Sequence, residues 1–261
     1  MQINFFKYQG TGNDFIILDN RENLYEELIT SQIKHLCDRR FGIGADGLML
    51  LNHKDAFDFE MKYYNADGRI GSMCGNGSRC LVKFANLQKV IKNSCTFSAY
   101  DGPHEARINE DNTVSVKMQD VDEVIKRKGV FILNTGSPHY ISLVRDLDKV
   151  DVYQEGKEIR YSKEFAENGI NVNFVDQNAK VEEINVRTYE RGVEDETLSC
   201  GTGVIASALV CYHNDNGYNH VIVHTKGGKL IVEFERLPEG NFHNIWLSGP
   251  AEKVFEGFVD I

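Results

Sequence analysis

Two cysteines, Cys74 and Cys200, each open a glycine-rich segment, CGNG and CGTG. A free thiol has a pKa of ~8.5, so a cysteine can act as an acid or as a base near neutral pH. If a helix follows each segment, its first N–H groups can bind a carboxylate, and the glycines let a ligand approach the backbone closely. The same helix terminus favours the thiolate form of a cysteine.

A thiolate and a thiol that face one carbon from opposite sides can invert it. The thiolate removes the α-proton, the thiol delivers a proton to the other face, and the helix N-termini stabilise the charge that develops on the carboxylate. Positioned acids and bases supply rate factors of ~10²–10⁴, and one lost oxyanion donor costs roughly 3–4 kcal/mol. The pattern therefore predicts cofactor-independent proton transfer at an amino-acid α-carbon, which needs the glycine-rich turns as well as the thiols.

Helical segments are expected directly after both cysteine motifs. One runs from Ser78 to Ile91, with apolar residues at helical spacing, and the other from Val204 to His213. The second, GVIASALVCYH, is apolar on nearly all sides, which is typical of a helix surrounded by other elements. Short alternating or β-branched runs predict strands around them, at residues 15–18, 113–118, 130–133, 221–225 and 229–235.

The two halves of the chain repeat one plan. Five short landmarks recur in the same order at offsets of 124 to 127 residues. They pair Thr11-Gly12-Asn13 with Thr135-Gly136-Ser137, Gly42–Asp46 with Gly169–Asn173, Asn65–Gly68 with Tyr189–Gly192, Cys74–Gly77 with Cys200–Gly203, and Asp101-Gly102 with Gly227-Gly228.

The repeat predicts an α+β fold of two pseudo-symmetric domains. Each is a curved, mostly antiparallel sheet or barrel wrapped around a central helix, with the active site in the cleft between the domains. The expected boundaries give residues 1–119, joined by a returning strand at about 250–261, and residues 120–249.

The composition indicates an ordinary globular chain, for which a small-molecule partner is the default. The chain has 261 residues, 41% of them hydrophobic, only 4 prolines, and a net charge of −10 without any run of Lys and Arg, which argues against nucleic-acid and anionic-membrane binding. No signal peptide or membrane span is evident, so we expect the cytoplasm, where thiols stay reduced. Cys37, Cys80, Cys95 and Cys211 are expected to be buried packing residues.

At this point the motifs GTGNDF, NADG, CGNGSRC, SPH, YERG and CGTG, in this order over nearly the whole chain, resemble the diaminopimelate epimerase family. The resemblance implies a fold of two pseudo-symmetric halves and a two-base mechanism without pyridoxal phosphate. It also implies interconversion of LL- and meso-2,6-diaminopimelate in lysine and peptidoglycan precursor synthesis, and a homodimer.

The resemblance also implies the roles of individual residues. A guanidinium can bind a carboxylate through two hydrogen bonds, which suits Arg191 to the distal carboxylate of the substrate. The implied set comprises Cys74 and Cys200 as the catalytic pair; Gly75, Asn76, Gly201 and Thr202 at the reacting carboxylate; Asn13, Asn65, Ser137, Asn171, Glu190 and Arg191 as further substrate contacts; and His139 and Glu190 as residues that tune the thiols. No metal is expected, because no C-x₂-C pair or matching histidine spacing occurs.

Two positions depart from the family pattern, and other functions remain open. Ser137 stands where many members have Asn, and Gly47 where some have Gln, which bears on the substrate more than on the reaction. A racemase or epimerase of the same fold for proline, hydroxyproline or histidine is the nearest alternative. A cysteine-nucleophile hydrolase or transferase, and a thiol redox sensor, are the others.

Overall fold

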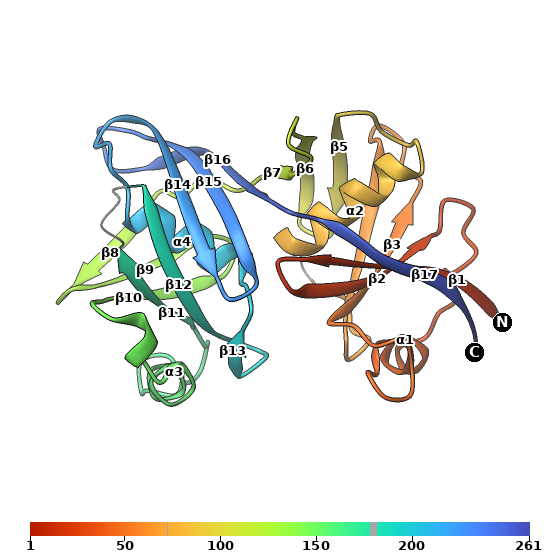
Figure 1. Cartoon of the computed structure of the whole chain (residues 1–261), viewed down its shortest axis with the longest axis horizontal. Helices are drawn as coiled ribbons and strands as arrows, with labels where there is room; N and C mark the ends of the chain where they lie inside the picture. Colours follow the sequence, from red (N-terminus) through yellow and green to blue (C-terminus); the bar gives the residue numbers. More distant parts are fainter. Residues whose placement is uncertain (72, 178–181) are drawn as a thin grey trace. The chain divides into compact units, whose positions relative to one another are not determined.

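The β-branched and alternating segments form strands. The computed structural model describes residues 1–71, 73–177 and 182–261 (Figure 1). The strands expected from the sequence are confirmed as β2 (Asn13–Asp19), β7 (Val114–Lys117), β9 (Val130–Asn134), β14 (Gly217–Thr225) and β15 (Gly228–Arg236).

The chain divides into two compact units. Unit 1 comprises Met1–Val116 and Gly249–Ile261, and unit 2 comprises Lys117–Ser248. A compact unit is not by itself a domain that folds alone, so the domain limits at 119/120 and 249/250 stay predictions.

The strands of unit 1 pair with their neighbours in a single order. Two of these pairings, β2 with β3 and β4 with β5, are parallel and the others are antiparallel. The order is β17 (Glu252–Asp260), β1 (Gln2–Gly10), β2, β3 (Gly47–Asn52), β4 (Phe59–Asn65), β5 (Ser94–Ala99), β6 (Gly102–Ile108) and β7.

Unit 2 repeats this order and these directions. Its parallel pairings are β10 with β11 and β12 with β14, and a short strand, β13 (Asp195–Thr197), is added beside β12. The order is β8 (Val124–Arg127), β9, β10 (Pro138–Val144), β11 (Asn171–Gln177), β12 (Glu183–Glu190), β14, β15 and β16 (Phe242–Gly249). The prediction of two pseudo-symmetric, mostly antiparallel halves is confirmed.

Each unit has a central helix that begins after its cysteine. Helix α2 (Gly75–Leu87) contacts β1, β2, β3, β6 and β17, and helix α4 (Gly201–Val210) contacts β9 to β12, β14 and β15 (Figure 1). Because strands on several sides touch one helix, each sheet curves around it, as expected. Residues Gly203–Leu209 of α4 are buried all round.

The central helices begin three residues earlier than the sequence predicted, so Ser78 and Val204 were wrong as starting points. Cys74 and Cys200 have extended backbones, with φ of −114° and −111°, and serve as the N-caps. Their carbonyls accept the first helical bonds, from Ser78 at 2.7 Å and from Val204 at 2.9 Å. The glycine-rich segments are therefore the first helical turns, and the N–H groups of these turns have no acceptor within the helix.

The ends expected at Ile91 and His213 were also placed too late. Helix α2 stops at Leu87, just before Lys89, which adopts a left-handed conformation with φ of 58°. Helix α4 stops at Val210 and Cys211 caps it.

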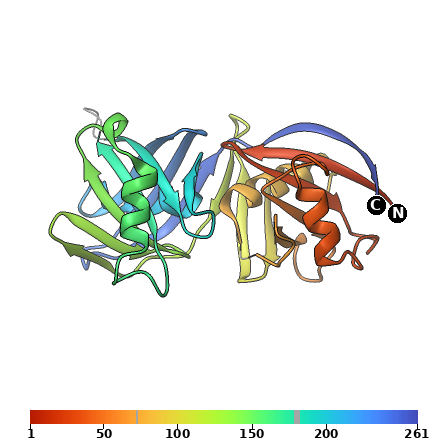
Figure 2. The same ribbon diagram turned by 90° about the horizontal axis from the view of Figure 1, so that it is seen from below.

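Two outer helices cover the other face of the strands (Figure 2). Helix α1 (Thr30–Cys37) packs Ile33 and Leu36 into a cluster with residues of β2 and β3. Helix α3 (Val152–Arg160), preceded by the 3₁₀ turn η1 (Leu147–Lys149), packs Val152 against residues of β11. Within the described ranges, no helix combines the length and apolar composition needed to span a bilayer.

The strand registers correct one match of the repeat. Phe15 pairs with Gly47 across β2 and β3, and His139 pairs with Asn171 across β10 and β11. The offset in this region is thus 124, so the looser match of Gly42–Asp46 with Gly169–Asn173 at 127 was wrong by three residues. By register, Asn173 corresponds to Met49.

Candidate active site

Cys74 lies at the N-cap of α2 and is half-buried. Its Sγ is 3.8 Å from Oδ1 of Asn13, the first residue of β2. The Nδ2 of Asn76, in the first turn of α2, is 3.4 Å from the same Oδ1. Asn13 therefore presents an oxygen to the thiol of Cys74.

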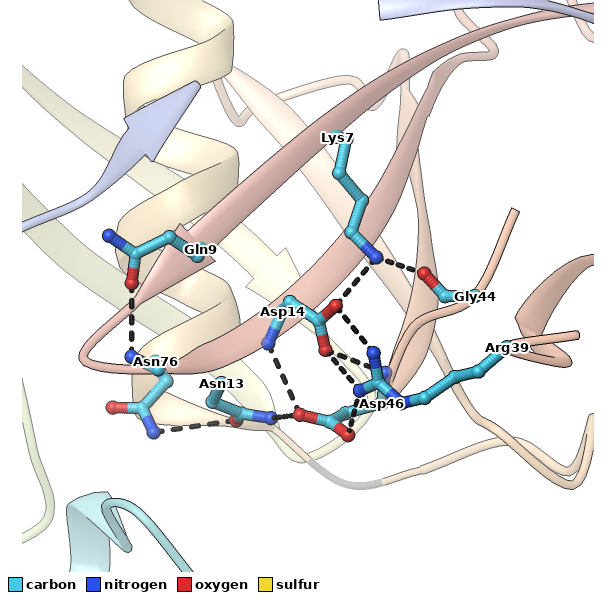
Figure 3. A network of polar contacts seen from close by, with 9 residues as sticks. Lys7, Gln9, Asn13, Asp14, Arg39, Gly44, Asp46 and Asn76 are labelled. Carbon is cyan, nitrogen blue, oxygen red and sulfur yellow. Dashed lines mark hydrogen bonds and ion pairs between the residues drawn. The ribbon is translucent and has the colours of Figure 1, made fainter. Parts of the chain in front are cut away.

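A network of charges determines which way the Asn13 amide points (Figure 3). Asn13 Nδ2 donates to Oδ2 of Asp46 at 2.5 Å, which leaves Oδ1 on the side of Cys74. Arg39 binds both Asp46, at 2.8 Å, and Asp14, at 2.6 Å. The sequence reasoning missed Asp46 and Arg39 as parts of the site, although Asp46 lies within one of the repeated landmarks.

Asp14 is the centre of this network. It also pairs with Lys7 at 2.6 Å, and Lys7 donates to the Gly44 carbonyl. Although partial burial opposes ionisation, the hydrogen bonds and charges of Arg39 and Lys7 lower the pKa of Asp14 to about 2. The carboxylate is thus charged throughout the neutral range, and ion pairs hold the start of β2, where Asn13 lies.

Arg79, one turn into α2, is completely buried. Its guanidinium donates to Asn76 Oδ1 at 2.9 Å, to the Gly75 carbonyl at 3.2 Å and to Thr11 Oγ1 at 3.2 Å. Asn76, which is 2% exposed, is thereby held with its Nδ2 toward Asn13. Sequence reasoning missed Arg79, and its only signal was its place in CGNGSRC.

Asn65 and Glu190 end corresponding strands, β4 and β12. Asn65 is exposed, and its N–H and C=O bond to the turn residues Arg69 and Gly68. Glu190 is half-buried, and its carbonyl accepts from the N–H of Glu194. Both side chains therefore lie where a strand leaves the sheet, at the same place in the two halves.

Cys200 is the N-cap of α4 and is 7% exposed. Its Sγ is 3.5 Å from Oγ1 of Thr202, in the first helical turn after Gly201. The Thr202 carbonyl accepts a hydrogen bond from Oγ1 of Thr135 at 2.9 Å. This bond ties the first turn of α4 to the turn between β9 and β10, which carries Gly136 at φ of 100°.

His139, on β10, is completely buried and neutral. Its Nδ1 lies 3.1 Å from Nδ2 of Asn173, which can only donate, so Nδ1 is the acceptor and the ring proton is on Nε2. Burial, reinforced by the positive charge of Arg191, lowers the pKa of His139 to about 3. Its Nε2 has no hydrogen-bond partner among the described residues, which is unusual for a buried polar atom.

Asn173 connects His139 to α4, and the sequence reasoning did not assign it a role. Its Oδ1 accepts from Thr188 at 2.9 Å, and its Nδ2 also reaches the Tyr140 carbonyl at 3.2 Å. A Cβ at Gly203 would lie only 2.3 Å from Oδ1 of Asn173. The glycine therefore gives the Asn173 amide room against the first turn of α4.

Ser137, Asn171 and Arg191 form a second group in unit 2. Ser137 Oγ accepts from Asn171 Nδ2 at 2.8 Å and from Arg191 Nη2 at 3.2 Å. Asn171 Oδ1 accepts from the Arg191 N–H at 2.9 Å, and Arg191 Nη1 donates to the Asn168 carbonyl at 2.9 Å. Ser137 Oγ thus accepts two hydrogen bonds, and its own hydroxyl proton is available to donate a third.

The structure brings most of the sequence-predicted residues together within each unit, whereas the contacts described for Asn65 and Glu190 are backbone bonds in the turns that follow their strands. In unit 1, Asn13, Gly75 and Asn76 surround Cys74. In unit 2, Gly201 and Thr202 adjoin Cys200, while Ser137 and Asn171 hold Arg191, whose charge acts on His139.

The other four cysteines are buried, which confirms that they pack inside the protein. Burial raises the pKa of Cys37, Cys80 and Cys95 to about 12 and that of Cys211 to about 11. These thiols are therefore neutral at neutral pH and unreactive as nucleophiles. In the described part of the chain, no three His, Cys, Asp or Glu side chains gather as metal ligands would.

Comparison with known proteins relates the chain to one family. The family model for diaminopimelate epimerase matches residues 5–124 and 131–254. A diaminopimelate epimerase from Flavobacterium psychrophilum is 50% identical over 96% of this chain and 98% of its own length. One from Chlorobaculum tepidum is 40% identical over 97% of this chain and 99% of its own length.

Solved structures share the fold at low sequence identity. A phenazine biosynthesis protein of the PhzF family from Bacillus anthracis superimposes with a TM-score of 0.77 at 16% identity, over 100% of both chains. A hydroxyproline epimerase from Agrobacterium vitis gives 0.64 at 12% identity, over 99% of this chain and 92% of its own. At such identities the likeness concerns the fold alone.

Proposed function

Because the chain belongs to the diaminopimelate epimerase family, we propose that it interconverts LL- and meso-2,6-diaminopimelate by moving one proton between two thiols, without a cofactor. The observation that carries the proposal is that both cysteines are N-caps of buried helices whose first turns are glycine-rich. Family membership makes the chain an isomerase, and the assignment of individual residues is our proposal.

In the proposed reaction, the thiolate of one cysteine takes the α-proton and becomes a thiol. The thiol of the other cysteine gives its proton to the opposite face of the same carbon and becomes a thiolate. The α-carbon is inverted, no proton is gained or lost overall, and the two cysteines have exchanged roles. The scheme requires Cys74 of unit 1 and Cys200 of unit 2 to serve one substrate.

The reacting carboxylate would bind at the helix N-termini. The first turns after Cys74 and Cys200 direct N–H groups away from their helices, and the helix dipoles favour negative charge there. These donors act most strongly when charge builds up on the carboxylate as the α-proton leaves. Asn76 and Thr202 belong to these turns, which supports their assignment to the reacting carboxylate.

The distal carboxylate would bind to Arg191. This guanidinium is exposed yet already oriented by Ser137 Oγ and the Asn168 carbonyl. The hydroxyl of Ser137 would give the carboxylate a second, neutral donor at the position where many family members have asparagine. A substrate with one carboxylate would leave Arg191 unused, which disfavours the proline, hydroxyproline and histidine racemases as alternatives.

His139 and Glu190 are proposed to tune the thiols. A neutral imidazole with its proton on the unpartnered Nε2 offers a hydrogen-bond donor, and a donor stabilises a thiolate as it forms. Because the pKa of His139 is about 3, the ring itself does not titrate in the working range. Asn13 has the opposite character beside Cys74, since it presents an acceptor. Asn65 and Glu190 occupy corresponding strand ends, which supports a shared role at the substrate.

The proposal is tested by isotope exchange in deuterated water. We expect deuterium at the α-carbon of diaminopimelate in the natural protein, and loss of epimerisation by at least about 10²-fold in both Cys74→Ala and Cys200→Ala. Cys211→Ala, which removes a buried thiol at the end of α4, is the matched control and is expected to stay active.

Other results would support the alternatives. Faster racemisation of proline or histidine than epimerisation of diaminopimelate would overturn the substrate. An acyl-enzyme mass without deuterium exchange would indicate a hydrolase. A reversible bond between Cys74 and Cys200 in a protein that exchanges no label would indicate a redox sensor.

Two further expectations belong to this proposal. The family resemblance suggests a homodimer, which light scattering on the purified protein checks. Six free thiols and a biosynthetic family suggest the cytoplasm, which cell fractionation checks.

A further inference from the structure

The amide of Asn13 lies between a group that can only accept hydrogen bonds and a group that can only donate them. Its Nδ2 donates to Asp46 Oδ2 at 2.5 Å, and its Oδ1 accepts from Asn76 Nδ2 at 3.4 Å (Figure 3). A carboxylate has no proton to donate, so Asp46 excludes the flipped arrangement in which the Asn13 oxygen would face it. Asp46 therefore determines which end of the Asn13 amide points toward Cys74.

The Asn76 amide is oriented in the same sense from the other side. Its Oδ1 accepts from Arg79 Nη2 at 2.9 Å, and a guanidinium has only donors. Its Nδ2 is then the end that faces Asn13. The two amides form a chain of hydrogen bonds with one direction, which begins at the Arg79 cation and ends at the Asp46 anion. Reversing the Asn13 amide would place two acceptors together at Asp46 and two donors together at Asn76.

The Asp46 carboxylate is held in place by further donors. Arg39 Nη2 donates to its Oδ1 at 2.8 Å, and the Asp14 N–H donates to its Oδ2 at 3.2 Å. Arg39 and Lys7 each pair with the Asp14 carboxylate at 2.6 Å. Because these two cations balance the two anions, the network acts on the nearby thiol through the orientation of Asn13 rather than through a net charge.

At Cys74 this chain presents a hydrogen-bond acceptor. The thiol Sγ donates to Asn13 Oδ1 at 3.8 Å. Such a bond exists only while the sulfur carries its proton, so it stabilises the thiol relative to the thiolate. Unit 2 differs, because Cys200 Sγ lies 3.5 Å from the hydroxyl of Thr202, which can donate to a thiolate as well as accept from a thiol.

We propose that Asp46 is a positioning residue which, by fixing the Asn13 amide, keeps the resting proton on Cys74. Cys74 is then the acid of the resting protein, and Cys200 is the thiolate that acts first as the base. The proton balance of the reaction is unchanged, since one thiolate takes the α-proton and one thiol gives a proton. The roles of acid and base rest on the proposed function, whereas the protonation of Cys74 does not.

Two features of α2 favour the opposite state of Cys74. The helix N-terminus and the positive charge of Arg79 both stabilise a thiolate. The N-terminus is common to both cysteines, and Arg79 would lower rather than raise the ionisation midpoint of Cys74, so neither feature accounts for the expected difference. The charged and titratable side chains on the strands packed against α2 are Lys7, Tyr8, Asp14, Asp19, His104, Glu105, Arg107, Glu252, Lys253, Glu256 and Asp260; α2 adds Arg79, Cys80 and Lys83, and the segment before β3 adds Asp38, Arg39, Arg40 and Asp46.

The protonation can be measured without substrate. The natural protein is alkylated with iodoacetamide over a range of pH, and Cys74 and Cys200 are quantified separately by peptide mass spectrometry. Because the thiolate is the form that reacts, the midpoint of each alkylation curve reports the ionisation of that cysteine. We expect a higher midpoint for Cys74 than for Cys200. Equal midpoints, or a lower one for Cys74, would overturn the inference even if the deuterium exchange shows that the protein is an epimerase.

The variant Asp46→Asn is expected to reverse the Asn13 amide. Arg39 retains the oxygen of the introduced amide, so its NH₂ group faces Asn13. The Asn13 oxygen then turns toward this donor, and the Asn13 NH₂ group turns toward Cys74, where it stabilises a thiolate. We expect the Cys74 midpoint to fall by about one pH unit, with faster alkylation at pH 7 and no change at Cys200.

Two further variants separate orientation from charge. Asp38→Asn removes a negative charge from the same segment, keeps an acceptor for the Arg40 N–H, and should leave the midpoint unchanged. The double variant Asp46→Asn/Asn13→Asp keeps the net charge and returns an acceptor to Cys74, so the midpoint should recover to the natural value or exceed it. A folded Asp46→Asn protein with an unchanged midpoint, or a double variant without recovery, would show that the inference is wrong. If neither variant folds, the comparison of the two cysteines in the natural protein decides.

Discussion

The two helices that follow the cysteines pack against strands arranged in the same order, but the side chains that contact their first turns differ in polarity. In unit 1, a Cβ added at Gly77 would contact Met49 and Phe15, which are both apolar. In unit 2, the corresponding Gly203 lies against Asn173, which holds the neutral His139. Both units therefore begin their central helix with a glycine-rich turn after a cysteine, while the side chains packed against that turn differ.

The charges inside the helices differ in the same sense. Helix α2 contains the buried Arg79 where α4 has Ile205. A network of ion pairs around Asp14 and Asp46 orients Asn13, whereas the corresponding residue of unit 2 is the neutral Ser137, which bonds to Asn171 and Arg191. A reaction that starts with one base and one acid needs two unequal sites. The two units share one backbone geometry, and the side chains around their cysteines make them unequal.

The largest effect is expected from making unit 2 resemble unit 1. His139→Phe introduces the residue that unit 1 has at this position and removes the Nε2–H donor, so kcat should fall by about 10²-fold or more in a steady-state epimerase assay. Adding Asn173→Met, the counterpart of Met49, should restore stability lost by the single variant because no amide is left unpaired, without restoring activity. A His139→Phe protein with natural kcat would show that the imidazole has no part in the reaction.

The glycines in the first helical turns should respond unequally to a methyl group. Gly203→Ala places a Cβ 2.3 Å from Oδ1 of Asn173, which three hydrogen bonds hold in place, whereas Gly77→Ala places it 3.1 Å from the flexible Met49 thioether. We expect a loss of about 1–3 kcal/mol in the free energy of unfolding for Gly203→Ala and less than about 1 kcal/mol for Gly77→Ala. Urea denaturation measures the free energy of unfolding of both variants. Equal losses would contradict the expected difference between Gly203, which lies against Asn173, and Gly77, which lies against Met49.

We expect the lowered pKa of His139 to make the free energy of unfolding depend on pH in the acid range. Its pKa is about 3 in the folded state, against ~6.5 in an unfolded chain. Below pH ~6.5 the imidazole is protonated in the unfolded state but stays neutral in the folded state. The free energy of unfolding therefore falls as pH falls, by up to about 1.4 kcal/mol per pH unit, until the ring of the folded protein also becomes protonated. His139→Phe removes this contribution, while Asp14 affects both proteins alike. The free energies of unfolding of the two should therefore converge in acid, and parallel pH curves would show that His139 titrates normally.

The smallest effect is expected at Ser137, which corresponds to Asn13. Ser137→Ala removes the acceptor shared by Arg191 and Asn171, at a cost of about 1 kcal/mol, so KM for diaminopimelate should rise about fivefold with kcat nearly unchanged. Ser137→Asn restores an oxygen acceptor and should bring KM back toward the natural value. A fall in kcat at constant KM would place Ser137 in the chemical step instead.

Much of the fold was predictable because its signals are local. Strand alternation and the apolar helix after Cys200 depend on neighbouring residues, and the structure confirms these strands and this helix, although not the helix limits. The ordered landmarks predicted the repeat of the two halves, with one match displaced by three residues. The helix starts were missed because glycine was treated as a loop residue, although an extended cysteine N-cap lets Gly75 and Gly201 begin the helices.

The rest of the site depends on contacts between distant segments. Asp46 matters because its loop meets Asn13, 33 residues away, and nothing near Asp46 in the sequence indicates this. Arg79 has the sequence character of an ordinary exposed helix residue, and only the fold buries it. The role of Asn173 was not predicted because Gly42-Ile43 was matched with Gly169-Ile170. This match displaced the alignment of the two halves by three residues, so Asn173 was not compared with its counterpart, Met49.

Strand β17 joins distant parts of the sequence within unit 1. It pairs with β1 from Gln2 with Asp260 to Gln9 with Glu252, whereas the other partner of β1, β2, follows directly in the chain (Figure 1). Closing so long a loop costs conformational entropy before the strand pairing is gained, and pairings of this kind raise the contact order and slow folding. We therefore expect the edge of the unit that carries Cys74 to be completed late in refolding.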